Sequence, residues 1–168
     1  PGEGPMDADL MIVGEQPGDQ EDLSGRPFVG PAGQLFDQIA GQAGLDRGQA
    51  FVTNAVKHFK FTPRGKRRLH QRPNASEIQH CRWWLDAEIA QVQPKLILGM
   101  GATAAEGLTG RRDAILSRRG KVEETPSRTP VLLTLHPSYL LRLPDPQAKA
   151  DATAQFRDDL KAAVQMLA

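Results

Sequence analysis

The chain of 168 residues carries 21 Lys or Arg against 20 Asp or Glu and is 39% hydrophobic, which is typical of one globular domain spanning residues 1–168. No apolar run approaches the ~20 residues of a membrane-spanning helix, and the acidic N-terminus does not resemble a signal peptide. A single cysteine, Cys81, excludes an internal disulfide and favours a reducing compartment. Arginines are about twice as numerous as lysines, which indicates a bacterial source. Together with the single cysteine, this leads us to expect a bacterial, cytoplasmic protein.

Four short apolar runs predict buried β-strands, at residues 10–13, 51–53, 96–98 and 131–135. Such continuous runs, unlike alternating ones, are typical of strands that helices cover on both faces. Apolar residues at helical spacing predict helices at residues 33–43, 76–91, 102–108 and 152–167. This alternation of strands and helices predicts a three-layer α/β/α domain around a four-stranded, mainly parallel sheet.

The segments that directly follow the predicted strands carry polar residues or glycines. Glu15 follows the first strand, Asn54 the second, a glycine turn at 99–101 the third and His136 the fourth. Each has an ordinary explanation when taken alone, as an exposed turn residue, a cap, a tight turn or a structural histidine. In a parallel sheet, however, the four strand ends lie along one rim, where open α/β sheets bind ligands. The combination therefore predicts a functional site at this rim.

Charge is distributed very unevenly along the chain. Residues 57–76 hold seven Lys or Arg and no carboxylate, whereas the first 22 residues hold seven carboxylates and no Lys or Arg. Within the basic stretch, residues 66–70 read KRRLH. A concentrated basic loop indicates a polyanionic partner. We expect this loop to hold nucleic acid and to place His70 against a reactive carbon.

Five motifs occur in order along the chain, reading GEQPGDQED at 14–22, GRPFVGPAG at 25–33, TNAVKHFKF at 53–61, KRRLH at 66–70 and HPS at 136–138. With these motifs the chain resembles the iron–sulfur branch of the uracil-DNA glycosylase superfamily. The glutamine after Glu15 and the inserted basic loop make it similar to the UdgX type, which links itself covalently to uracil-containing DNA. The resemblance implies a uracil-DNA glycosylase-like fold.

The resemblance also implies an activity, namely the excision of uracil from DNA, preferably single-stranded, followed by one covalent capture through His70 at C1′ of the deoxyribose. Catalysis is expected from His70, Glu15 and His136, with neighbouring cations keeping His70 neutral. Uracil is expected to contact Gln16, Phe28, Asn54 and His136. DNA is expected to contact Lys66, Arg67, Arg68, Gly101, Thr103, Ser138, Leu141 and Arg142, with the helix start at Gly101 and Thr103 offering backbone amides to a phosphate.

A [4Fe–4S] cluster is also implied by the resemblance, but only in part. The branch carries a Cys-x-x-Cys pair before the first strand, and this chain has none. The two remaining ligand positions correspond to His58 and Cys81, and two ligands do not hold a four-iron cluster. Either an N-terminal segment is missing or the protein folds without a cluster. We favour the first alternative, because His58 and Cys81 are otherwise unexplained.

Two other functions remain open from the sequence. One is an ordinary multi-turnover uracil-DNA glycosylase that uses an activated water, with His70 contacting only phosphate. The other is a non-catalytic nucleic-acid-binding α/β module. The pair Leu140 and Leu141 is equally open, because it either forms a wedge that fills the gap left by a flipped base or packs in the core. We expect a monomer whose partner is uracil-containing DNA, with no protein partner and no membrane.

Overall fold

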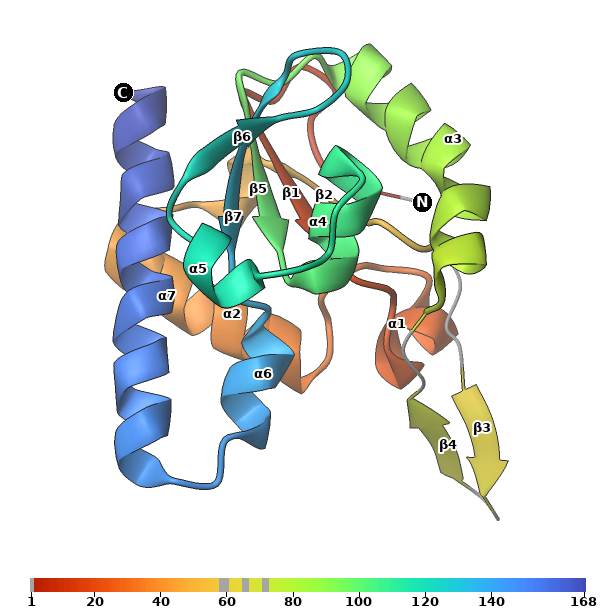
Figure 1. Cartoon of the computed structure of the whole chain (residues 1–168), viewed down its shortest axis with the longest axis vertical. Coiled ribbons are helices and arrows are strands. Elements are labelled where there is room, and N and C mark those ends of the chain that lie inside the picture. The colour runs from red at the N-terminus through yellow and green to blue at the C-terminus, as the bar shows by residue number, and fades with distance from the viewer. Residues whose placement is uncertain (1, 58–60, 65–66, 71–72) are drawn as a thin grey trace.

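The fold is built around a five-stranded sheet, seen in a computed structural model that describes residues 2–57, 61–64, 67–70 and 73–168, with the backbone alone for 61–64 and 67–70. The strand order is β2-β1-β5-β7-β6 (Figure 1). Four of these strands are parallel: β1 (Leu10–Gly14), β2 (Phe51–Asn54), β5 (Leu96–Met100) and β7 (Pro130–Thr134). The fifth, β6 (Val122–Glu124), pairs with β7 in the antiparallel direction at the edge.

The register of the parallel strands aligns their carboxyl ends. Gly14 at the end of β1 pairs with Asn54 at the end of β2, and Met100 at the end of β5 pairs with Thr134 at the end of β7. The segments that leave these four strands therefore start side by side at one rim of the sheet. This alignment is the first condition for the predicted site.

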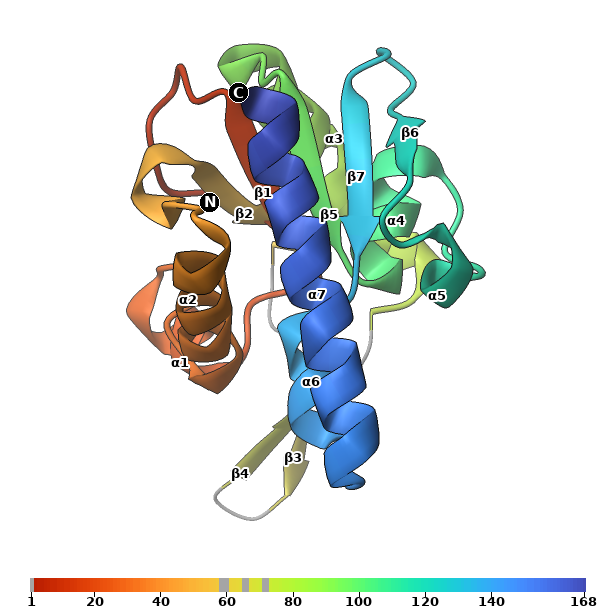
Figure 2. The same ribbon diagram turned by 90° about the vertical axis from the view of Figure 1, so that its left-hand side faces the viewer.

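Helices cover both faces of the sheet, which gives three layers (Figure 2). One face carries α2 (Pro31–Ala43), α6 (Pro137–Arg142) and α7 (Pro146–Leu167), and the other carries α3 (Ala75–Val92), α4 (Ala102–Thr109) and α5 (Ile115–Arg118). The short helix α1 (Asp19–Ser24) follows β1 at the rim, and a single 3-10 turn (Arg47–Gln49) precedes β2. The three-layer α/β/α architecture predicted from the sequence is confirmed.

The core is divided into two apolar layers by the sheet, because successive residues of a strand point to opposite faces. Leu10 and Ile12 of β1 belong to the layer beneath α2 and α7, together with Phe36. Met11 and Val13 belong to the layer beneath α3 and α4. Both faces of each parallel strand are buried, which explains why these strands read as continuous apolar runs in the sequence.

The predicted number of strands in the sheet was wrong by one. β6 was not predicted because it is a short edge strand, and its one apolar residue, Val122, is 51% exposed. A second, two-stranded sheet was also not predicted. It is the antiparallel hairpin of β3 (Phe61–Arg64) and β4 (Arg67–His70), in which His70 pairs with Phe61. The basic loop expected from the sequence is thus in part regular structure.

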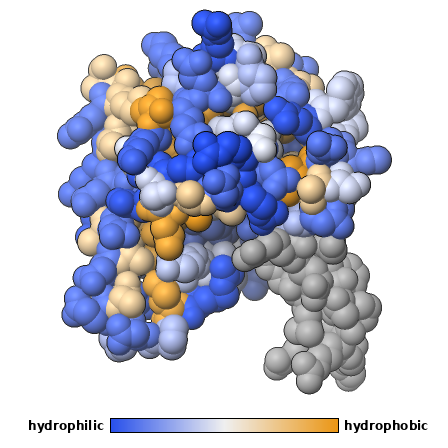
Figure 3. Space-filling model, in the orientation of Figure 1, coloured by the Kyte–Doolittle hydropathy of each residue, from blue (hydrophilic) through white to orange (hydrophobic). Residues whose placement is uncertain are grey.

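The hairpin lies apart from the main sheet and projects from the same end of the molecule as α1 and α6 (Figures 1 and 2). It is inserted between β2 and α3. None of the described helices is long and apolar enough to cross a membrane. The face seen in Figure 3 is mostly hydrophilic, with apolar residues in small separate patches, as on ordinary monomer surfaces.

Candidate active site

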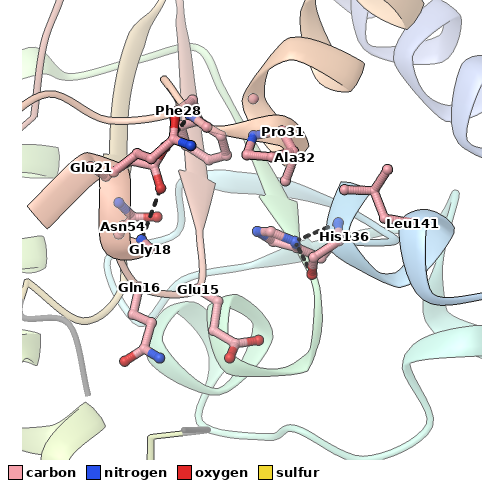
Figure 4. Close-up of a pocket in the computed structure, with 14 residues that line it drawn as sticks. Glu15, Gln16, Gly18, Glu21, Phe28, Pro31, Ala32, Asn54, His136 and Leu141 are labelled. Atoms are coloured by element: carbon pink, nitrogen blue, oxygen red, sulfur yellow. Dashed lines mark hydrogen bonds between the residues drawn. The ribbon is translucent and has the colours of Figure 1, made fainter. Parts of the chain in front are cut away.

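A cavity of about 320 Å³ opens at the rim where the parallel strands end. In Figure 4, Phe28 and Asn54 lie on one side of it, His136 and Leu141 on the other, and Glu15 and Gln16 along its lower edge. The cavity is thus lined by seven residues that the sequence predicted: Glu15, Gln16, Phe28, Asn54, His136, Ser138 and Leu141. Its size is in the usual range for sites that enclose small organic molecules.

Phe28 forms a wall of the cavity from an unusual backbone conformation. Its φ of 55° lies in the left-handed region that residues other than glycine rarely adopt. Two glycines make room for it, because a Cβ at Gly33 would lie 2.1 Å from the Phe28 carbonyl oxygen and a Cβ at Gly14 would lie 2.5 Å from the ring Cζ. The ring is 6.1 Å from that of Phe36, which backs it from the core. Phe28 therefore offers a flat apolar surface in a fixed position.

The imidazole of His136 is held in one tautomer by the first turn of α6. Its Nδ1 accepts the backbone N–H of Ser138 at 3.1 Å and lies 2.7 Å from Ser138 Oγ. A ring nitrogen that accepts from a backbone N–H carries no proton, so the neutral imidazole is protonated at Nε2. The ring extends into the space between Phe28 and Glu15 (Figure 4). His136 thus brings a hydrogen-bond donor to the cavity.

Two amide side chains, Gln16 and Asn54, line the same cavity and are 7% and 8% exposed. Asn54 is the last residue of β2, beside Gly14 of β1. A Cβ at Gly14 would lie 2.7 Å from Asn54 Oδ1, so the absence of a side chain there lets the amide approach. Each amide has both donors and acceptors, which suits recognition of a heterocyclic edge that presents both.

The carboxylate of Glu15 is placed by the continued pairing of β1 and β2 beyond their last residues. The Ala55 N–H donates to the Gly14 carbonyl and the Val56 N–H donates to the Glu15 carbonyl, both at 2.9 Å. Glu15 is partly exposed at the lower edge of the cavity (Figure 4). A carboxylate at this position is able to stabilise a positive charge that develops next to the cavity.

Glu21 was not predicted as a site residue, yet its carboxylate joins two loops of the cavity. One oxygen accepts the Gly18 N–H at 2.9 Å, and the other accepts the Val29 N–H at 2.8 Å together with the Gly30 N–H. Gly18 is the N-cap of α1 and Glu21 its third residue, a capping-box arrangement. The spacing between Gly18 and Glu21 was the signal in the sequence that could have revealed this role.

Arg47, in the 3-10 turn before β2, was also missed. Its guanidinium donates to the Phe28 carbonyl oxygen at 2.9 Å and to the Pro27 carbonyl oxygen at 3.1 Å. It also forms an ion pair with Asp37 at 3.3 Å. A lone arginine between two elements gives no sequence signal for such contacts, since they are made to backbone carbonyls distant in the chain.

A partly buried ion pair lies behind Asn54. Lys57 Nζ donates to the Asn54 carbonyl oxygen and to Thr53 Oγ1, both at 2.6 Å, and pairs with the carboxylate of Glu88. Burial lowers the pKa of Lys57, and the negative charge of Glu88 opposes that shift. Because Glu88 belongs to α3, the pair ties the end of β2 to the helix that follows the hairpin.

Comparison with known proteins agrees with this geometry, since residues 1–161 match the profile of the uracil DNA glycosylase superfamily. The chain belongs to this superfamily. It is 38% identical over 151 residues to a type-4 uracil-DNA glycosylase of Pyrobaculum aerophilum, covering 86% of this chain and 74% of that protein. It is 37% identical over 142 residues to a type-4 uracil-DNA glycosylase of Thermotoga maritima (84% and 70%), and 32% identical over 164 residues to one of Archaeoglobus fulgidus (94% and 78%).

Two predicted DNA contacts of this superfamily member, Gly101 and Thr103, lie at the start of α4. The backbone N–H of Gly101 donates to the Thr134 carbonyl at 2.9 Å, so this N–H is already engaged within the protein. A contact between Gly101 and DNA stays a prediction. Thr103 is 1% exposed, and its hydroxyl has no partner among the described residues. Any phosphate contact by Thr103 would therefore have to come from its backbone rather than its side chain.

The pair Leu140 and Leu141, which the sequence left open, divides between core and surface. Leu140 is fully buried in the core layer beneath α2 and α7. Leu141 is 43% exposed and lines the cavity. Arg142 is exposed and donates to Ser138 Oγ at 3.3 Å. Only Leu141 therefore has the position that a wedge residue needs.

Several predicted site residues fall wholly or partly outside the described part of the structure. His58 and Lys66 lie outside the described residues. Arg67, Arg68 and His70 are described as backbone of β4, and nothing is stated of their side chains. The structure therefore brings the predicted base-contacting residues together, whereas the predicted roles of the hairpin side chains remain predictions.

The described residues do not fit the [4Fe–4S] cluster that the resemblance implied. Among them, no group of three or more His, Cys, Asp or Glu side chains is arranged to hold a metal ion. Cys81, the one cysteine of the chain, packs with Val56 and Ile78, and its Sγ accepts the Lys57 N–H at 3.4 Å. One cysteine among the described residues is too few for the usual set of four cluster ligands.

Proposed function

We propose that the protein is a DNA glycosylase that excises uracil. The observation that carries this proposal is the Nε2–H donor of His136 next to the Phe28 ring and the Asn54 amide in one cavity. The similarity to type-4 uracil-DNA glycosylases supports the same substrate. A glycosylase cannot reach the bond between base and sugar inside a duplex, so the nucleotide must be flipped out or already unpaired.

The base is held by stacking and by its polar edge. Phe28 supplies an apolar face for the pyrimidine ring. The Asn54 amide donates to and accepts from the uracil edge, and the reversed pattern of cytosine leaves at least one of these groups unpaired. Burial of the amide makes that mismatch costly, because no water replaces the lost hydrogen bond. Gln16, equally buried in the cavity wall, provides a second amide contact.

Bond cleavage separates charge between the base and the sugar. The electron pair of the C1′–N1 bond leaves with the base, and the His136 Nε2–H stabilises the negative charge that develops on uracil O2. The sugar gains oxocarbenium character, as in glycoside hydrolysis. The Glu15 carboxylate at the cavity edge stabilises this positive charge. These two residues act on opposite charges of the same transition state.

We further propose that the sugar is captured rather than hydrolysed. A lone pair of the neutral His70 imidazole forms a bond to C1′, and the proton lost from the alkylated ring passes through Glu15 to the departing uracil anion or to solvent. This step rests on the basic KRRLH motif, whose last four residues form β4 in a hairpin that projects from the same end of the molecule as α1 and α6. The resulting N-linked sugar has a poor leaving group, so the reaction ends after one turnover. We expect the protein to act on single-stranded DNA as a monomer.

The experiment is incubation with a single-stranded oligonucleotide that contains one uracil, measuring free uracil and denaturing gel mobility together. We expect about one uracil per protein molecule and a covalent band of lower mobility. His70→Ala should abolish the band and keep uracil release. Release of many uracils per molecule by the unaltered protein, without a band, would leave the glycosylase and remove the capture step. Absence of free uracil and of a band would remove both and favour a binding module.

A further inference from the structure

The loop that carries Phe28 is held by two side chains of opposite charge. The Arg47 guanidinium donates hydrogen bonds to the backbone carbonyls of Pro27 and Phe28, at 3.1 and 2.9 Å. The Glu21 carboxylate accepts hydrogen bonds from the backbone N–H groups of the next two residues, Val29 and Gly30. Four successive residues thus have their carbonyls or amides bound by a guanidinium or a carboxylate.

These hydrogen bonds hold Phe28 in a backbone conformation that is unfavourable by itself. A phenylalanine with a φ of 55° is disfavoured in isolation, and such conformations persist only where the surroundings enforce them. Arg47 makes two hydrogen bonds through its planar guanidinium, a geometry that lysine cannot reproduce. The Arg47 guanidinium carbon also lies 5.9 Å from the centre of the Phe28 ring, and Arg47 does not line the cavity.

We propose that Arg47 and Glu21 are positioning residues that fix Phe28 as the stacking surface for the base. Arg47 acts from outside the cavity and only through Phe28. Glu21 acts through the amides of Val29 and Gly30, and also joins this loop to Gly18 of the segment that carries Glu15. This inference rests on the proposed excision of uracil and names the residues that set its base-binding surface.

The first test is a double-mutant cycle between Arg47 and Phe28, with uracil release measured in single turnover. Here kcat denotes the limiting single-turnover rate constant and KM the concentration that gives half of it. Arg47→Lys should lower kcat/KM roughly tenfold, mainly by raising KM, because a displaced stacking surface weakens ground state and transition state alike. In a Phe28→Ala background the same substitution should change kcat/KM less than about twofold. The matched control is Arg157→Lys, since the Arg157 guanidinium donates to the Gln42 side chain at 2.8 Å and neither residue lines the cavity. An equal effect of Arg47→Lys in both backgrounds would overturn the inference.

A second test does not depend on activity or on the substrate. Hydrogen exchange at the Val29 and Gly30 amides, followed by NMR, should accelerate in both Glu21→Ala and Arg47→Lys. Exchange in β5 at the centre of the sheet should stay unchanged, which shows that the fold is intact. If the unaltered protein releases no uracil, the proposed function fails. The exchange rates still test whether Arg47 and Glu21 hold the loop that carries Phe28. Unchanged exchange at residues 29 and 30 would overturn this inference.

Discussion

The rings of Phe28 and His136 lie 6.3 Å apart, centre to centre, with their planes inclined by 27°. A planar base stacked on Phe28 is therefore roughly parallel to the imidazole as well. The Nε2–H of His136 lies in the plane of its ring, so it runs roughly along the plane of such a base and not into its face. The near-parallel arrangement of the two rings therefore suits the role proposed for His136, as a donor to a base that stacks on Phe28.

Substitution of His136 should mainly slow the chemical step. His136→Ala removes a donor to the developing charge on the base, so we expect kcat to fall by roughly 10²–10³ with little change in KM. The measurement is single-turnover release of uracil from a labelled oligonucleotide. Ser138→Ala is the comparison, because it removes the hydroxyl that lies 2.7 Å from His136 Nδ1 but keeps the backbone N–H that fixes the tautomer. An equal loss of activity in both variants would contradict the role of the ring.

A methyl group at Gly14 should disable the cavity. The new Cβ of Gly14→Ala would lie 2.5 Å from Phe28 Cζ and 2.7 Å from Asn54 Oδ1, so both base-contacting side chains must move. We expect kcat/KM for uracil release to fall at least about a hundredfold, with a loss of about 1–3 kcal/mol in the free energy of unfolding.

The matched substitution Gly41→Ala tests whether any added methyl group is harmful. Gly41 lies on the exposed side of α2, and a Cβ there would meet no atom within 4 Å. We expect the free energy of unfolding to rise by about 0.5–1 kcal/mol, with unchanged activity. Urea titration of the two variants checks this pair. A loss of activity in Gly41→Ala would remove the steric explanation for Gly14.

The buried carboxyl of Asp159 should make stability depend on pH in the acid range. Burial raises the pKa of Asp159 above its ordinary value of 3.8, although the hydrogen bond from Thr134 and the charge of Arg119 oppose this. The folded protein then keeps the proton to a higher pH than the unfolded chain does. The stability that Asp159 contributes is therefore fully present below pH 3.8 and is lost as the pH rises through the raised pKa.

Urea unfolding between about pH 3.5 and pH 6 measures this contribution as the difference from Asp159→Asn. We expect the difference in the free energy of unfolding to shrink as the pH rises. The asparagine still accepts from Thr134 but leaves donors of Arg119 unpaired, so the variant should be less stable by about 1–3 kcal/mol at the lower pH. A difference that grows with pH would show that the pKa is lowered instead.

The hairpin arginines should contribute to the salt dependence of DNA binding. Each phosphate contact to single-stranded DNA adds about 0.7 to the slope of log K against log salt concentration. We expect Arg67→Ala and Arg68→Ala each to reduce that slope by about this amount, measured by fluorescence anisotropy. Arg128→Ala is the control, because Arg128 lies in the connection between β6 and β7, at the end of β7 opposite the cavity. Equal slopes for all three variants would exclude the hairpin as a DNA contact.

Most of the framework could be predicted because it follows from burial. The runs that became β1, β2, β5 and β7 are buried and mainly apolar, with Thr53 and Thr134 as polar exceptions, since helices cover both faces of the sheet. The helices begin earlier than their apolar spacing indicated, because Pro31 and Pro146 start them after capping residues. β6 and the hairpin carry no such apolar run, so this signal did not distinguish them from loops.

The cavity was predictable to the extent that it depends on side chains at strand ends. Glu15, Asn54 and His136 follow strands in the sequence, and the parallel register brings them to one rim. Glu21 and Arg47 were missed because they bind backbone groups, and backbone groups are the same at every position of a sequence. Apart from the spacing of Gly18 and Glu21, which indicates a capping box, contacts of that kind become visible only when the loops are folded.

The separation of the β3–β4 hairpin from the main sheet has a consequence for the proposed function. The chain enters the hairpin just after Lys57 and leaves it into α3, and Lys57 is bonded to Cys81 and Glu88 of that helix. The segments on the two sides of the insertion are therefore held together by contacts outside the hairpin itself. Under the proposed function, the residue that captures the sugar lies on this insertion and the residues that contact the base lie on the scaffold, so a change in one need not alter the other.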